Sequence, residues 1–153
     1  MEDPVNDEID KYLQDCVRIE PLALQEEYVR LPADYAYWNE QYRQALEASL
    51  VAKADKERIW STCYLVETER THPTTGKPVT VDYAKAAVEA NQDYYEAVKA
   101  AISTEVELTR IKGVLEAIRA KREMLVSLGA TLRQEMQHDP MVRDSVATQR
   151  LAR

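Results

Sequence analysis

The chain has 153 residues, of which 45% are hydrophobic and 31% charged, with a formal net charge of −7. It holds three glycines and no phenylalanine, so the composition favours one elongated helical domain with a narrow core over a compact globule. No apolar run approaches the ~18 residues of a membrane span, and the acidic N-terminus is unlike a signal peptide. We therefore expect a cytoplasmic protein that makes no membrane contact.

The charge is unevenly spread along the chain. Residues 1–40 carry eleven acidic and three basic side chains, whereas nine basic and five acidic side chains lie between Arg110 and the end. Cys16 and Cys63 are too few and too far apart for a disulfide framework, so we interpret them as buried thiols in a reducing compartment.

The N-terminal part predicts two short helices. Asn6 or Asp7 can cap a helix that reaches about Val17, and Pro21 suits the first turn of a second helix that ends near Arg30. We expect the Leu31-Pro32 pair to interrupt the helix there. Residues 1–31 are therefore predicted to form an acidic helical arm.

Residues 33–70 are predicted to form a long third helix with a heptad repeat of apolar and small positions. These positions are Tyr35, Trp38, Tyr42, Ala45, Ser49, Ala52, Lys56, Ile59, Cys63 and Val66. The small residues in the middle should let a second helix approach closely.

Two prolines and Gly76 between His72 and Pro78 predict a turn. The chain would then fold back as an antiparallel hairpin with its loop near 71–80. Helix rise alone places Val66 beside the start of the last helix and Trp38 beside Leu115.

The last helix is predicted to run without a break from Asp82, which can cap it, to His138. Its seam positions are Val81, Ala84, Val88, Asn91, Tyr95, Val98 and Ile102, then, after a phase slip near Gly113, Ile111, Leu115, Ile118, Arg122, Leu125, Gly129, Leu132 and Met136. Asn91 and Arg122 at core-phase positions are typical of residues that fix register. Residues 140–153, after Pro140, are predicted to be a flexible tail.

The predicted fold class is all-α: a long, coiled-coil-like antiparallel hairpin over residues 32–139 with short N-terminal helices. The last helix outruns the third, so its C-terminal apolar residues should lack intramolecular cover and form a homo-oligomer interface. These residues are Leu125, Leu128, Leu132 and Met136.

No pattern in the sequence points to catalysis. There is no nucleophile and base pair, no glycine-rich phosphate loop and no Glu-x-x-His pattern for a di-iron bundle. His72 and His138 sit beside predicted helix ends and are interpreted as surface histidines. We expect a non-enzyme without a metal or cofactor.

Basic residues near aromatic ones suggest one functional surface. Lys53, Lys56 and Arg58 lie close to Trp60 and Tyr64 in the sequence, and Arg70, Lys77 and Lys85 belong to the hairpin end. Cations beside aromatic rings are typical of proteins that bind single-stranded DNA. Interleaved acidic residues, such as Asp55 and Glu57, fit an ordinary solvated helix equally well.

The chain resembles the UvsY-type recombination mediators of tailed bacteriophages over roughly residues 25–130. The resemblance rests on Tyr35-Ala36-Tyr37-Trp38-Asn39, a polar loop, Asp82-Tyr83, and the run from Gly113 to Arg122 (Gly-Val-Leu-Glu-Ala-Ile-Arg-Ala-Lys-Arg). In this register the family's basic Lys-x-Arg pair falls on Ser61 and Cys63, and the nearest cations are Lys53, Lys56 and Arg58.

The resemblance implies a small helical protein that forms ring-like homo-oligomers and binds single-stranded DNA. Such a protein helps to load a RecA-like recombinase onto DNA coated by single-strand DNA-binding protein. The alternative is a structural or assembly coiled coil, such as a virion scaffold or an adaptor. If DNA binds elsewhere, the basic residues Arg110, Lys112 and Arg119 are the second candidate.

Overall fold

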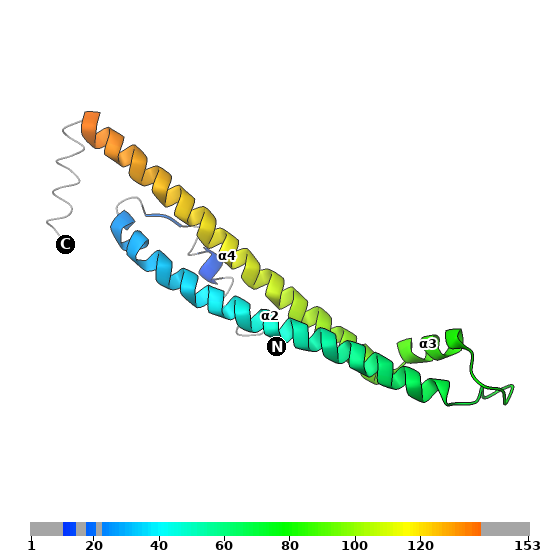
Figure 1. Cartoon of the computed structure of the whole chain (residues 1–153). Coiled ribbons are helices and arrows are strands. Elements are labelled where there is room, and N and C mark those ends of the chain that lie inside the picture. Colours follow the sequence, from blue (N-terminus) through cyan, green and yellow to red (C-terminus); the bar gives the residue numbers. More distant parts are fainter. Residues whose placement is uncertain (1–10, 15–17, 21–22, 139–153) are drawn as a thin grey trace. The chain divides into compact units, whose positions relative to one another are not determined.

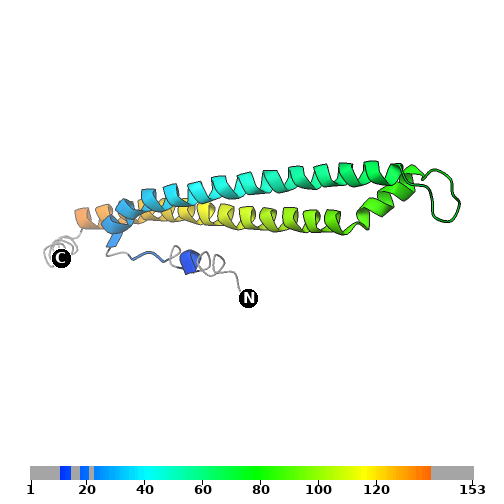
Figure 2. The same cartoon turned by 90° about the horizontal axis from the view of Figure 1, so that it is seen from below.

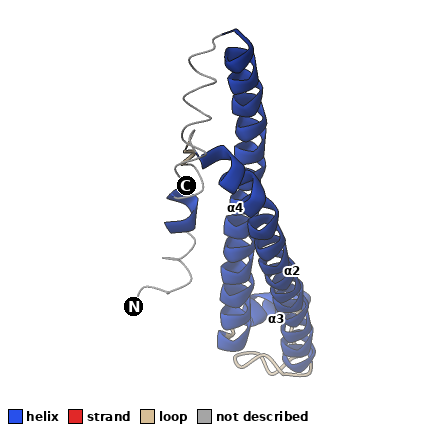
Figure 3. Ribbon diagram, turned by 90° about the vertical axis from the view of Figure 1, so that its left-hand side faces the viewer, coloured by secondary structure: helices blue, strands red, loops and turns tan. Residues whose placement is uncertain are grey.

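The computed structural model describes residues 11–14, 18–20 and 23–138, and these residues are almost entirely helical (Figures 1 and 3). The helices are α2 (Leu24–Thr68), α3 (Val81–Glu89) and α4 (Gln92–His138), with a further helical turn at residues 11–14. Within the described ranges there is no strand, only an isolated bridge between Thr71 and Pro78. The all-α prediction is confirmed. The first helix beyond residue 14, the Cys16 thiol and the predicted tail lie outside the described residues.

The chain divides into two compact units. The first unit is Met1–Asn39 with Gly113–Arg153, and the second unit is Glu40–Lys112. Helices α2 and α4 contribute to both, and in each unit their segments run antiparallel and pack against each other.

In the second unit α2 and α4 meet through small side chains. Ser49 of α2 is 2% exposed, and Ala97 and Ala101 of α4 are also buried. Small residues at facing positions let two helix backbones approach closely, as the sequence predicts. Ala84 and Val88 of α3 complete this core, because both are fully buried.

In the first unit larger side chains fill the core. Val114, Leu115, Ile118 and Leu125 of α4 are buried, as is Trp38 of α2. The burial of Leu115, Ile118 and Leu125 confirms three positions of the seam predicted for this part of α4, whereas Val114 is buried outside that predicted seam.

The predicted register is confirmed by one contact in the first unit. Arg119 Nη2 donates to Tyr35 Oη at 3.3 Å. Tyr35 lies one turn before Trp38 and Arg119 one turn after Leu115, so the contact agrees with the expected Trp38 and Leu115 pairing.

The interruption predicted at Leu31-Pro32 is wrong, because α2 continues through Pro32. Proline in a helix removes one backbone hydrogen bond and bends the helix, and Figure 2 shows the first turns of α2 at an angle to those that follow. Pro32 itself is exposed, whereas Leu31 and Trp38 on either side of it are buried. Packing of these two side chains holds the helix together across the proline.

The single helix predicted for Asp82–His138 is also wrong, because it is divided at Asn91. The Asn91 side-chain oxygen accepts hydrogen bonds from the backbone N–H groups of Asp93 at 2.8 Å and Tyr94 at 3.3 Å. This is an N-cap, which starts a new helix where asparagine was expected to occupy a seam. At Gly113, where the sequence predicts a phase slip, α4 continues.

The break at Asn91 changes which residues of α4 form the seam of the second unit. Tyr95 and Ile102 were expected in the seam but are 57% and 59% exposed, while Ala97 and Ala101 are buried. Because α4 starts anew after Asn91, it does not continue the heptad spacing of α3. Its buried positions therefore lie one or two residues from the predicted ones.

A similar shift occurs in the first unit at the predicted polar seam position. Arg122 is exposed, and Lys121 beside it is buried. Lys121 Nζ lies 2.7 Å from Glu27 Oε2 of α2, and their side chains are 9% and 20% exposed. A charged pair therefore takes the place of the expected buried arginine.

The connection between α2 and α3 is the predicted turn. The His72 N–H donates to the Lys77 carbonyl at 2.8 Å, and the Gly76 N–H donates to the His72 carbonyl at 2.9 Å. Gly76 adopts φ 63°, which glycine tolerates best. The cap of α3 is Thr80, not Asp82, since the Thr80 side chain accepts from the Tyr83 N–H at 3.4 Å.

Candidate nucleic-acid interface

Lys56, Trp60 and Tyr64 share one face of α2 in the second unit. Their spacing of four residues places them one above another on the helix surface, and each side chain is half-buried. The Trp60 and Tyr64 rings stack, with centroids 5.0 Å apart and planes 8° apart. One face of each ring is therefore covered by the other ring, and only the remaining faces are left for a base.

Lys53 lies on the same side of α2, but it is already engaged. Its Nζ lies 3.0 Å from Glu105 Oε1 of α4, and both side chains are about half exposed. This ion pair joins the two helices and lowers the positive charge that Lys53 can offer to a phosphate.

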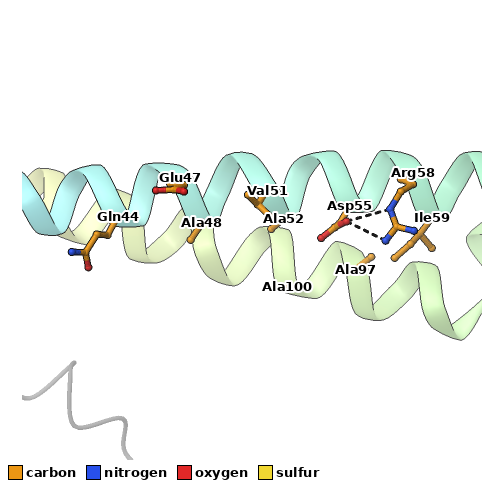
Figure 4. Close-up of a pocket in the computed structure, with 10 residues that line it drawn as sticks. All are labelled: Gln44, Glu47, Ala48, Val51, Ala52, Asp55, Arg58, Ile59, Ala97 and Ala100. Carbon is orange, nitrogen blue, oxygen red and sulfur yellow. Dashed lines mark hydrogen bonds and ion pairs between the residues drawn. The ribbon is translucent and has the colours of Figure 1, made fainter.

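Arg58 lies on the opposite face of α2 from Lys56, since two residues advance a helix by about 200°. It forms an ion pair with Asp55 at 3.1 Å, and Figure 4 shows the two side chains together at the wall of a groove. The groove has a volume of about 610 Å³, and four of its ten lining residues are alanines, two from α2 and two from α4. The structure therefore separates Arg58 from the cations with which the sequence grouped it.

The cations at the turn end of the second unit differ in their partners. Arg70 forms an ion pair with Glu67 at 2.8 Å, whereas Lys77 in the turn and Lys85 on α3 are exposed. In the part of the chain that the structure describes, Lys56, Lys77 and Lys85 form no ion pair. These three lysines are the predicted cations best able to accept a phosphate.

The second candidate cations are divided between the units. Arg110 and Lys112 belong to the second unit and Arg119 to the first. The hydrogen bond from Arg119 to the Tyr35 hydroxyl raises the pKa of that guanidinium above its ordinary value. This hydrogen bond joins α4 to α2 within the first unit, so Arg119 already has a partner in the chain.

The predicted oligomer contacts have more intramolecular cover than expected. Leu125 is fully buried, and Leu128, Leu132 and Met136 are half-buried. The first turns of α2 supply part of this cover, because Tyr28 Oη would lie 3.3 Å from a Cβ added at Gly129. The expectation that Leu125 lacks intramolecular cover is wrong.

Two features were missed in the sequence. The buried pair of Lys121 and Glu27 joins residues far apart in the chain, so no local spacing could reveal it. The exposed apolar side chains of Tyr95, Ile102 and Val106 on α4 could have been found from Asn91, which, with Asp93 in the following turn, is a usual helix start.

Other site types find no support among the described residues. No group of three or more His, Cys, Asp or Glu side chains there could hold a metal ion. None of the helices described is both long and apolar enough to cross a membrane. Cys63 is a free, half-buried thiol.

In comparisons with known proteins, no family model, curated sequence or solved structure matches the chain.

Proposed function

We propose that this protein is a non-enzymatic recombination mediator of the phage type. It binds single-stranded DNA and helps to load a RecA-like recombinase onto DNA covered by single-strand DNA-binding protein. Lys56, Lys77 and Lys85 contact phosphates, and the free face of Trp60 or Tyr64 stacks on a base.

The observation that supports this proposal is the shared face of Lys56, Trp60 and Tyr64. A cation next to a pair of rings suits a strand whose phosphates and bases alternate. Such contacts do not depend on base sequence, because every base has a flat face and every nucleotide a phosphate. The resemblance to the UvsY-type proteins supplies the role in loading a recombinase.

A second candidate, a structural or assembly coiled coil, is favoured by the ion pairs of Lys53, Arg58 and Arg70. Carboxylates on the same or the facing helix lie within 3.1 Å of all three cations. Surface pairs of this kind are usual on solvated helices that bind no nucleic acid. Affinity for single strands separates the two candidates.

The test is fluorescence anisotropy of a short labelled oligonucleotide at several salt concentrations. We expect binding that weakens steeply with salt, because each lysine releases counterions from the strand. Replacing two phosphate contacts by Lys56→Glu with Lys77→Glu should raise the Kd about tenfold or more and lower the salt slope by about two.

The matched control is Arg133→Glu, an exposed cation on α4 of the first unit. This variant has the net charge change of one reversal but leaves the proposed surface intact, so its Kd should stay close to that of the native chain. Absence of binding at low salt would favour the assembly protein. Equal losses per charge reversal in both kinds of variant would show attraction to overall charge without a defined surface.

A further inference from the structure

In the second unit, helix α4 carries an apolar stripe on the side that faces away from α2. The stripe consists of Tyr95, Ile102 and Val106, whose side chains are 57%, 59% and 54% exposed. Steps of seven and four residues place them within about 40° of one another around the helix. The buried Ala97 and Ala101 lie on the other side, so α4 has two apolar faces and α2 covers one.

Charged residues along one flank of the stripe alternate in an order that complements itself. Reading along α4, Glu96 is acidic, Lys99 basic, Ser103 neutral, Glu107 acidic and Arg110 basic. Steps of three and four residues keep all five on the same flank. Residues at equal distances before and after Ser103 therefore carry opposite charges.

Two antiparallel copies of α4 that cross near Ser103 would therefore be complementary in charge. Lys99 of each copy would lie opposite Glu107 of the other, so this pair would occur twice. A parallel pair would not achieve this, because Lys99 and Glu107 are roughly 12 Å apart along one helix axis.

We propose that a second copy of this chain docks antiparallel on the stripe and forms a two-fold dimer with Ile102 near the axis. Such a contact is isologous, since the same patch serves both copies. It brings Ile102 close to its counterpart and places Val106 next to Ile102 of the other helix. The stripe spans only about 17 Å of helix, less than a standard interface needs, so the dimer dissociates on dilution.

Sedimentation equilibrium over a range of protein concentrations tests the dimer. The native chain should pass from monomer to dimer, and Ile102→Glu should raise the dissociation constant at least about tenfold by placing two like charges at the axis. The control is Val126→Glu, which changes another exposed apolar residue of α4 and should leave association unchanged. Circular dichroism would check that both variants stay helical.

A mixing experiment tests the antiparallel order of charges. Lys99→Glu alone and Glu107→Lys alone should each associate about tenfold more weakly than the native chain, because like charges then face each other. An equimolar mixture should regain association, since residue 99 of one variant then opposes its opposite charge at residue 107 of the other.

Three outcomes would overturn the proposal. The native chain could remain a monomer at every concentration, which would leave the stripe to a different protein. Association could survive Ile102→Glu, which would place the contact elsewhere on α4. The mixture could associate no better than the separate variants, which would exclude the antiparallel pairing. Each readout is a mass and is independent of DNA binding.

Discussion

The ion pair of Lys121 and Glu27 is the residue-scale feature with the largest expected effect on stability. A buried charge that loses its partner is costly, because water no longer solvates it. Lys121→Met should therefore lower the free energy of unfolding by about 3 kcal/mol, as measured by urea denaturation. Adding Glu27→Leu should recover most of the loss, since no charge is then left buried.

The control for this prediction is Arg58→Ala, because its ion pair with Asp55 is exposed. Such a pair contributes less than about 1 kcal/mol. A loss in Lys121→Met no larger than that in Arg58→Ala would contradict the account of a buried, mutually dependent pair.

Glu40 gives a second residue-scale prediction, which concerns pH. Hydrogen bonds from Arg43 at 2.7 Å and Gln44 at 3.1 Å lower the pKa of the Glu40 carboxyl from 4.5 to about 2. A lowered folded-state pKa stabilises the fold above the unfolded-state pKa, and this contribution disappears as the pH falls toward 2. A carboxyl titration by NMR should show the low midpoint, and Arg43→Met should move it upward. An unchanged midpoint in that variant would contradict the assigned cause.

At the scale of elements, the helix start at Asn91 is tested by removing its cap. Asn91→Ala leaves the N–H groups of Asp93 and Tyr94 without their acceptor, so we expect a loss of about 1 kcal/mol in unfolding free energy. Asn91→Asp keeps an acceptor oxygen and should show little loss. Equal stability of the native chain and the alanine variant would contradict the role of Asn91 as a cap.

The continuity of α4 through Gly113 is tested by Gly113→Ala. A Cβ at this position would meet no atom within 4 Å, so alanine should gain helix propensity of up to about 1 kcal/mol without a clash. Gly129→Ala is the matched comparison and should gain less, since its Cβ would lie 3.3 Å from Tyr28 Oη. Destabilisation by Gly113→Ala would contradict the unstrained, continuous helix at this position.

The sequence was sufficient for the long helices, the turn at residues 72–78 and the antiparallel register, because periodicity and turn residues are local signals. It predicted an interruption at Leu31-Pro32 that is absent, and it missed the one at Asn91. The backbone preference of proline predicts a helix break at Pro32. The packing of Leu31 and Trp38 outweighs the one hydrogen bond that the proline removes. Asn91 fits the heptad spacing of a seam residue, but in the structure its side chain caps a new helix instead.

The same limits explain the candidate site. Spacing alone could place Lys56, Trp60 and Tyr64 on one face, and the structure agrees. It could not show that Glu105, from another helix, engages Lys53. Closeness in sequence also placed Arg58 in one group with Lys56. Two residues advance a helix by about 200°, so Arg58 lies on a different face of α2.

At the scale of the whole molecule, the net charge of −7 opposes DNA binding by a single chain. Local charge matters more than net charge at short range, because salt screens charges more than about 10 Å apart. Several copies that each offer a weak site can also bind one strand together with higher affinity than any single copy. Self-association and DNA binding are thus expected to support each other.

The most direct test of the proposed function measures the DNA-dependent ATPase activity of a RecA-like recombinase on single strands already covered by single-strand DNA-binding protein. The proposed mediator should shorten the delay before ATP hydrolysis begins, and Lys56→Glu with Lys77→Glu should abolish that effect while Arg133→Glu retains it. An unchanged delay in the presence of the native chain, with the recombinase active on bare strands, would contradict the proposed role.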